Sequence, residues 1–215
     1  MHTYIREPIN GLTHLAGAVL AFFGLIALLI KAAGSQASSV EFFAVIVFGI
    51  SMILLYSASA AYHSVFASDR VIAFLRRIDH SMIYLLIAGS YTPFCLISLE
   101  GKTGWTIFTI VSIMAILGII FKLVWFSSPR WLSTALYIIM GWIIIFAGAP
   151  LSSALSSNGF MLLLLGGIFY TVGGIIYGLK PKWLQFKHMG FHEIFHIFIL
   201  LGSLSHFLSI YMYVL

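Results

Sequence analysis

The sequence is poor in charged residues and has a single cysteine. Asp, Glu, Lys and Arg together make up 8% of its 215 residues, whereas hydrophobic residues make up 61%. Soluble domains carry about 25% charged residues, so this composition excludes an ordinary water-soluble domain. Cys95 has no partner for an internal disulfide. The 11 Lys and Arg residues form no long run, so the sequence does not indicate a nucleic-acid partner.

Long apolar runs fill most of the chain. A helix needs about 20 apolar residues to cross a hydrocarbon core of about 30 Å, and 215 residues have room for seven such helices with short connections. The runs are apolar on every side, whereas strands of transmembrane barrels alternate apolar and polar residues. We therefore predict an all-α, polytopic membrane protein, a seven-transmembrane helix bundle that is a single domain over residues 1–215. The predicted spans are about 12–30, 41–62, 79–98, 104–124, 131–149, 159–179 and 193–213.

The Lys and Arg residues are distributed unevenly over the predicted loops. Positively charged short loops are retained in the cytoplasm, so the side richer in Lys and Arg is the cytoplasmic one. One side carries only Lys31 and Lys102, and the other nine residues lie on the side of the N-terminus. These nine are Arg6, Arg70, Arg76, Arg77, Lys122, Arg130, Lys180, Lys182 and Lys187. We therefore predict a cytoplasmic N-terminus and a C-terminus outside the cell.

Several ionisable side chains lie within or beside the predicted spans. Such a side chain is costly in lipid unless it is paired or hydrated, so it indicates a functional site. Six of them open the first, third and seventh spans or close the second: His14, His63, Asp79, His80, His192 and His196. All six are predicted to lie at the cytoplasmic end, which we interpret as one shared site.

The sharpest local signal is the pair His192 and His196. Four residues apart on a helix, they are separated by about 40° around the axis and about 6 Å along it, which suits one metal ion. A catalytic zinc commonly has three protein ligands, and His63 lies at the depth that the third requires. Asp79 is predicted at a similar level, either as a base toward water or as a residue that orients a ligand histidine. Ser59 lies one turn from His63, on the same face.

Structural roles stay open for these residues. An intramembrane histidine can be a hydrogen-bonded packing residue, and Ser59 can line a helix contact. Asp79 can form a salt bridge with Arg76 or Arg77 instead of taking part in chemistry. The spacing of these residues in the sequence is compatible with the structural roles as well as with the metal site.

The segment H-E-I-F-H, residues 192–196, also fits the zinc-protease pattern H-E-x-x-H with Glu193 as the base. Glu193 lies about 100° from His192 around the helix, and no G-x-x-H follows, so we favour the membrane metal site over a protease. His206 lies about 15 Å and about 280° beyond His196, and we expect it to be a core residue outside the site.

Polar residues also precede the first predicted span. Glu7, Asn10 and His14 are spaced three and four apart and share one face if the helix begins early. They are then placed to make polar contacts behind the metal ligands. A simple helix start capped by Asn10 or Thr13 is equally compatible with the pattern.

These residues fall within longer motifs that cover the chain. The motifs are E-P-I-N-G-L-T-H (7–14), S-A-A-Y-H (59–63), D-H-S-M-I-Y-L-L-I-A-G-S-Y-T-P-F (79–94), and H-E-I-F-H with the later S-H-F. With them the sequence resembles the bacterial hemolysin III branch of the progestin and adiponectin receptor (PAQR) superfamily. The resemblance implies a seven-helix protein of the bacterial plasma membrane with a cytoplasmic N-terminus. It also implies zinc held by His63, His192 and His196, with a carboxylate at Asp79 nearby, and a variable residue at Glu193.

Three functions follow as hypotheses. The first is a zinc-dependent hydrolase of a membrane lipid amide or ester, in which Asp79 takes a proton from water and Ser59 helps to stabilise the oxyanion. The second is a pore-forming cytolysin or channel with structural zinc, as the hemolysin name implies, acting as a homo-oligomer. The third is a sensor of the state of the membrane that turns over no lipid.

Overall fold

The computed structural model describes residues 4–99, 101–187 and 189–215, and all regular structure among them is helical. Seven helical segments of these residues are long and apolar enough to cross a membrane, which confirms the predicted seven-helix bundle. Two π-helical segments, Phe94–Ser98 and Ile210–Val214, extend α3 and α8, and 3-10 turns occupy Ile143–Ala147 and Lys182–Leu184. The α-helices are α1 (Pro8–Gly34), α2 (Ser39–Ser64), α3 (Asp69–Pro93), α4 (Gly101–Val124), α5 (Arg130–Trp142), α6 (Gly148–Ala154), α7 (Ser157–Leu179) and α8 (Phe191–Ser209).

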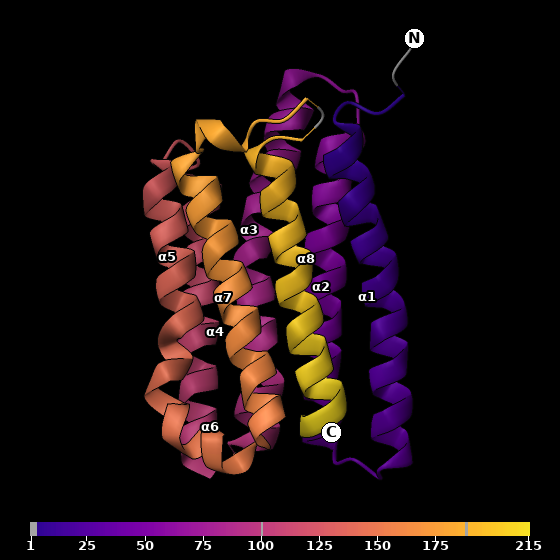
Figure 1. Ribbon diagram of the computed structural model, residues 1–215, viewed down its shortest axis with the longest axis vertical. Helices are drawn as coiled ribbons and strands as arrows, with labels where there is room; N and C mark the ends of the chain where they lie inside the picture. The colour runs from indigo at the N-terminus through magenta and orange to yellow at the C-terminus, as the bar shows by residue number, and fades with distance from the viewer. Residues whose placement is uncertain (1–3, 100, 188) are drawn as a thin grey trace.

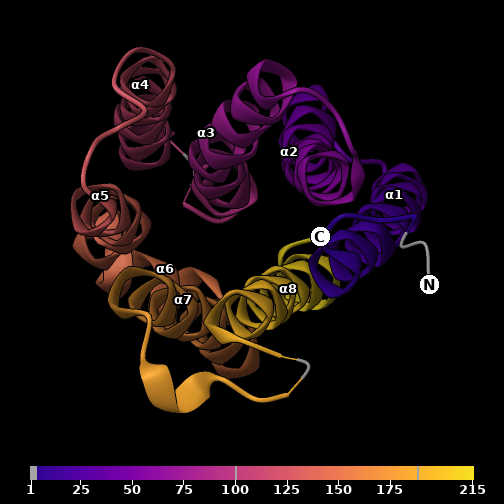
Figure 2. The ribbon, with the colours of Figure 1, turned by 90° about the horizontal axis from the view of Figure 1, so that it is seen from above.

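The helices follow one another around a ring, and α8 closes the ring by packing against α1 and α7 (Figure 2). The start of α1 and the C-terminus lie at opposite ends of the bundle (Figure 1). We call the end at which α1 begins the N-terminal end. α2 and α7 end there, and α3, α5 and α8 begin there. The six ionisable residues predicted to share one site therefore lie towards this end.

The outer face of the ring is apolar. Leu20, Phe23 and Ile30 of α1 are exposed on it, as suits contact with lipid chains. Between the helices, large side chains such as Phe48 and Tyr56 are almost completely buried. The protein is therefore built as an integral membrane protein, with its polar side chains turned inward or gathered at the helix ends.

The structure corrects the predicted start of the third helix. α3 begins at Asp69, so Asp79 and His80 lie well inside this helix rather than opening it. The turns of the helix before Asp79 carry Arg76 and Arg77, and these charges kept the turns out of the span predicted from hydropathy. The helix nevertheless continues through them, because its backbone hydrogen bonds form within the segment whatever the polarity of the side chains.

The fifth predicted span, 131–149, is likewise not one continuous α-helix, because α5 passes into a 3-10 turn before α6 begins. At this point the hydroxyl of Tyr91, from the end of α3, inserts between the backbone hydrogen-bonding groups of the fifth span. Its hydroxyl oxygen lies 2.9 Å from the carbonyl oxygen of Met140 and 2.7 Å from that of Gly141. It also accepts a hydrogen bond from the N–H of Ile144 at 2.9 Å. A side chain inserted among the backbone hydrogen bonds of a helix interrupts the helix. The sequence pattern of that helix alone does not reveal such an insertion.

α2 and α3 approach each other closely at Gly89. A methyl group at this position would lie 2.5 Å from the Cβ atom of Ser51 on α2, well inside van der Waals contact. Glycine is therefore required for the two helices to pack at this distance. Because α2 carries His63 and α3 carries Asp79, this contact helps to set the relative position of two predicted site residues.

We expect Gly89→Ala to lower the melting temperature of the purified protein. Overpacking a tight contact costs about 1–3 kcal/mol, more than the gain of up to about 1 kcal/mol from replacing a helical glycine with alanine. Gly148→Ala is the matched control, because no atom lies within 4 Å of the added methyl group there. A melting temperature for Gly89→Ala equal to that of Gly148→Ala would contradict the close approach of α2 and α3.

Candidate metal centre

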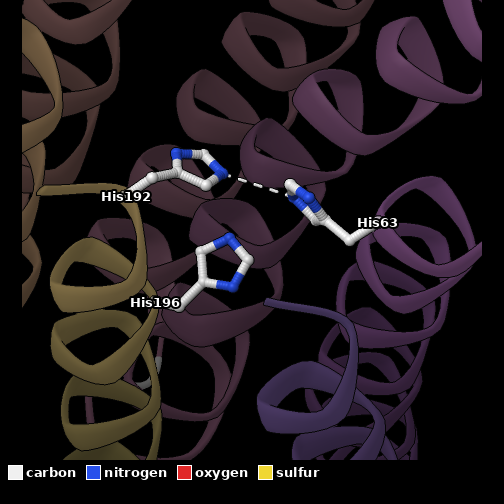
Figure 3. A group of neighbouring side chains, drawn as sticks. All are labelled: His63, His192 and His196. Carbon is white, nitrogen blue, oxygen red and sulfur yellow. Dashed lines mark hydrogen bonds between the residues drawn. The ribbon is translucent and has the colours of Figure 1, made fainter. Parts of the chain in front are cut away.

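Three histidines from two helices meet at the N-terminal end of the bundle (Figure 3). His63 lies at the end of α2, and His192 and His196 lie in the first two turns of α8. One ring nitrogen of each lies within 4.8 Å of those of the other two. His63 and His196 are each only 1% exposed. The three residues, which we call the histidine triad, could hold one metal ion.

A buried hydrogen-bond network joins α2 to α8 one level deeper in the bundle. The hydroxyl of Tyr56 on α2 lies 2.5 Å from Oγ of Ser203 on α8. The hydroxyl of Tyr170 on α7 lies 2.8 Å from the same Ser203 oxygen. In a lipid environment such groups have no water to bond with, so these contacts hold the three helices in one register. They thereby place the end of α2 opposite the start of α8.

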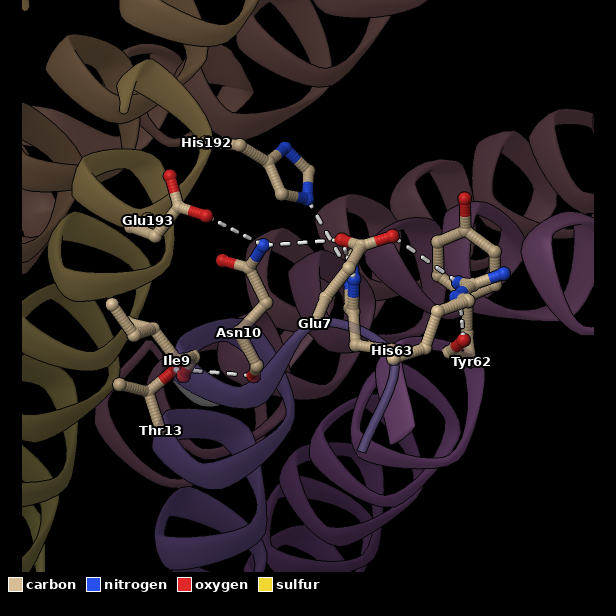
Figure 4. A network of polar contacts seen from close by, with 9 residues as sticks. Glu7, Ile9, Asn10, Thr13, Tyr62, His63, His192 and Glu193 are labelled. Carbon is tan, nitrogen blue, oxygen red and sulfur yellow. Dashed lines mark hydrogen bonds and ion pairs between the residues drawn. The ribbon is translucent and has the colours of Figure 1, made fainter. Parts of the chain in front are cut away.

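The segment before α1 is bound to the end of α2. The backbone N–H of Glu7 donates to the carbonyl oxygen of His63 at 2.9 Å, and that of Arg6 donates to Ser64 at 3.3 Å. The guanidinium of Arg6 donates to the carbonyl oxygen of Tyr62 at 2.5 Å and lies over the Tyr62 ring. These contacts place the side chain of Glu7 directly against the triad (Figure 4).

Glu7 fixes the orientation of one ring of the triad. Nδ1 of His63 lies 2.7 Å from Oε2 of Glu7, and because a carboxylate can only accept, Nδ1 carries the proton. The hydrogen bond with His63 lowers the pKa of Glu7 to about 2, against the opposing effect of burial. Glu7 is therefore a carboxylate at neutral pH, and Nε2 of His63 keeps its lone pair toward the centre of the triad.

The other two rings present nitrogen atoms toward the same point. Nε2 of His192 lies 3.3 Å from Nε2 of His63. Nδ1 of His196 is buried and forms no hydrogen bond with any described residue. Ring nitrogens that converge in this way can all ligate one cation when their lone pairs face it, which requires His192 to carry its proton on Nδ1.

His14 packs directly against the triad. Its ring stacks on that of His196 with a centroid distance of 3.6 Å and an angle of 6° between the planes. The ring is buried, and neither of its nitrogen atoms is hydrogen-bonded within the described part of the chain. The sequence predicted His14 at the right end of the bundle but gave no signal for this stacking, which depends on the crossing of α1 and α8.

The structure assigns Glu193 a structural contact away from the triad. Its Oε2 atom accepts from the backbone N–H of Gly190 at 2.8 Å, at the start of α8. Its Oε1 atom accepts from Nδ2 of Asn10 at 2.9 Å, which links α8 to α1. Both carboxylate oxygens are thus engaged in holding the helix start, an arrangement that disfavours the protease interpretation of H-E-x-x-H.

A cavity of about 100 Å³ adjoins the triad and extends into the bundle. Ser59 and Asp79 lie close together at its wall, and His192 and His196 line it as well. Deeper in the bundle the lining is largely apolar and includes Leu86, so the cavity joins a polar end to an apolar interior.

The alternative role of Asp79 as a salt-bridge partner is wrong for this structure. Asp79 is buried, and within the described residues no ion pair joins it to Arg76 or Arg77. The carboxylate is therefore directed to the cavity rather than neutralised by a neighbouring arginine.

Three further histidines line the cavity outside the triad: His14, described above, His80 and His206. Nε2 of His80 lies 3.2 Å from the hydroxyl of Tyr177. His206 is buried, and its Nε2 atom lies 3.1 Å from the carbonyl oxygen of Leu163, at hydrogen-bond distance. The ten-residue spacing therefore does separate His206 from the metal-binding group, as the helical geometry predicts.

Comparison with known proteins identifies the family of the chain. A family model described as Haemolysin-III related matches residues 2–207. The chain belongs to the haemolysin-III-related family. It is 45% identical to Hemolysin-3 of Bacillus cereus, covering 100% of this chain and 95% of that protein. It is 41% identical to a Hemolysin-3 homolog of Bacillus subtilis (strain 168), covering 99% and 96%.

A plant protein is also similar to this haemolysin-III-related chain. Heptahelical transmembrane protein 1 of Arabidopsis thaliana is 29% identical, over 95% of this chain and 68% of the plant protein. The resemblance drawn from the sequence motifs is thus confirmed at the level of the family. The residues 7–14, 59–63 and 192–196 that carried the resemblance are also those that meet at the triad.

We expect Glu7→Gln to weaken metal binding by about tenfold to a hundredfold, because removing the carboxylate behind a ligating histidine has effects of that size. Competition with a chelator, with Zn²⁺ as the probe ion, measures the affinity. Asp69→Asn is the matched control, since it removes an exposed carboxylate at the same end of the bundle. Equal affinities of the two variants would show that Glu7 does not set the ligand properties of His63.

Proposed function

We propose that this haemolysin-III-related protein is a zinc-dependent hydrolase that cleaves an amide or ester bond of a membrane lipid. We further propose that it lies in the plasma membrane of a bacterium with its N-terminus in the cytoplasm. The excess of Lys and Arg at the N-terminal end and the two Bacillus relatives support this placement.

The donor set supports zinc as the metal. Zn–N distances of about 2.0–2.1 Å in a tetrahedral site place two ligand nitrogens about 3.3–3.4 Å apart. The Nε2 atoms of His63 and His192 are 3.3 Å apart. Three imidazoles, one of them backed by the Glu7 carboxylate, are also the usual donors of a catalytic zinc. This convergence of three histidines beside a largely apolar cavity is the observation that carries the proposal.

When bound, zinc supplies a Lewis acid that polarises a carbonyl group and makes water more acidic. The residues of the chain then have distinct roles. The apolar wall of the cavity holds an acyl chain and keeps bulk water away from the scissile bond. Asp79 accepts a proton from water at a carboxylate oxygen, as a buried base beside the triad. Ser59, whose hydroxyl has no hydrogen-bond partner among the described residues, donates to the oxyanion of the substrate.

We expect Asp79→Asn to reduce lipid hydrolysis by about a hundredfold or more, in line with the usual contribution of a general base, while zinc content stays near one ion per chain. Fatty-acid release from vesicles containing ceramide and phosphatidylglycerol, followed by mass spectrometry, measures the reaction, and Asp69→Asn is the control. Retained hydrolysis in Asp79→Asn would remove this residue from the mechanism. A zinc-loaded wild type that hydrolyses no lipid would favour structural zinc in a membrane-state sensor.

The name of the Bacillus cereus relative, Hemolysin-3, makes pore formation by a homo-oligomer the second candidate. We expect dye-loaded liposomes carrying the purified protein to stay intact, because the interior cavity is lined mainly by apolar side chains and a conducting pore must be hydrated. Dye release measured by fluorescence tests this, with protein-free liposomes as the control. Leakage that survives replacement of all three triad histidines with alanine would instead support a pore.

A further inference from the structure

A second, smaller pocket lies at the same end of the bundle, where α4 ends and α5 begins. Its volume is about 40 Å³, room for roughly three water molecules or one phosphate group. Three cationic side chains line it, each from a different helix: Arg76 of α3, Lys122 of α4 and Arg130 of α5. None of them belongs to the histidine triad or lines the larger cavity. We call this the cationic pocket.

Lys122 is withdrawn from solvent, and Arg76 and Arg130 are half-buried. Lys122 is only 4% exposed, and its Nζ atom donates to Oγ of Ser128 at 3.2 Å. Ser128 in turn lies 3.4 Å from Oγ of Ser133. Nη1 of Arg130 is buried and has no hydrogen-bond partner among the described residues. The pocket therefore contains one nearly inaccessible ammonium group and one unpartnered guanidinium nitrogen.

No carboxylate forms an ion pair with these charges within the described part of the chain. The ion pairs found there join Glu7 to Arg6 and to His63, and none reaches the cationic pocket. Asp79, three residues after Arg76, lines the larger cavity but not this pocket. Buried charges of one sign are costly unless an opposite charge or several hydrogen bonds accompany them.

One aromatic ring offsets part of this cost. Phe126 has Arg76 at 5.0 Å and Lys122 at 5.6 Å from its centroid. A cation over an aromatic face gains about 0.5–2 kcal/mol, which is less than the cost of burying an uncompensated charge. Packing on Phe126 therefore accounts for the position of these side chains but not for the gathering of three cations in one pocket.

We propose that the cationic pocket is a binding site for a phosphate group. A phosphate presents several oxygen acceptors and a negative charge, which match the two guanidinium groups and the ammonium group around the pocket. The hydroxyls of Ser128 and Ser133 supply further donors at its wall. No residue of the triad lines this pocket, so phosphate binding can be tested without measuring hydrolysis.

The walls of the pocket favour a lipid as the source of the phosphate. His80, Tyr137 and Tyr177 line both the cationic pocket and the larger apolar cavity, so the two spaces share one partition. Arg130 also lies over the ring of Tyr177, with a centroid distance of 5.5 Å. Because the two spaces adjoin at this wall, an amphiphile that binds its phosphate among the cations has apolar side chains close by to contact its acyl chain. Free inorganic phosphate has the same head-group chemistry but makes no use of that cavity.

Thermal unfolding of the purified protein in detergent tests the site. The ligands are dioleoyl phosphatidic acid, the matching diacylglycerol that lacks the phosphate, and inorganic phosphate. We expect phosphatidic acid to raise the melting temperature of the wild type and diacylglycerol to leave it unchanged. Lys122→Gln and Arg130→Gln should each weaken the binding of phosphatidic acid by about tenfold or more. Lys182→Gln, which removes an exposed cation at the same end, should bind as the wild type does.

Each variant is compared with its own melting temperature without ligand, so a change in stability is not mistaken for a change in binding. The two substitutions lie in different helices, and either one suffices if the other variant does not fold. A shift with inorganic phosphate but not with phosphatidic acid would support the phosphate site and reject a lipid source. No shift with either ligand, or equal shifts in Arg130→Gln and Lys182→Gln, would overturn the proposal.

Discussion

The hydrogen bond between Glu7 and His63 is the contact on which the candidate metal centre depends. Lipid offers no partners to polar atoms, so each histidine placed among these helices must find its partners inside the protein. Glu7 gives His63 one such partner, fixes its proton on Nδ1 and leaves Nε2 facing His192. The backbone bonds that hold Glu7 against the end of α2 are therefore part of the site, although they touch no substrate.

Much of the fold and part of the candidate site could be predicted from sequence because both follow from local patterns. Continuous apolar runs of about 20 residues match the length of a membrane-spanning helix and lack the alternation of barrel strands, so seven runs predicted seven helices. The spacing of His192 and His196 is a property of a single helix, and the depth of His63 follows from the end of its span. These local patterns placed the three histidines at one end of the bundle, and the packing of α2 against α8 brings them together in the structure. The roles of these histidines and of Asp79 stay predictions.

The rest could not be predicted because it depends on contacts between segments distant in sequence. The span predicted from hydropathy began after the charged turns of the third helix, although the helical backbone includes these turns. The insertion of Tyr91 into the fifth span cannot be seen from the sequence of either helix alone. His14 lies against His196 only because α1 crosses α8 beside the triad. In the sequence analysis, Lys122 and Arg130 served only to predict which end of the bundle faces the cytoplasm. That they line one pocket is seen only in the assembled structure.

The triad draws its members from the second helix and from the last. During synthesis the ribosome releases α2 long before α8, so His63 enters the membrane while its two companions are still unmade. The centre is complete only after the final span has been inserted and the ring has closed. Capture of a metal ion would thus mark the end of biogenesis, and a nascent chain that stalls before α8 presents only one of the three histidines to the ion.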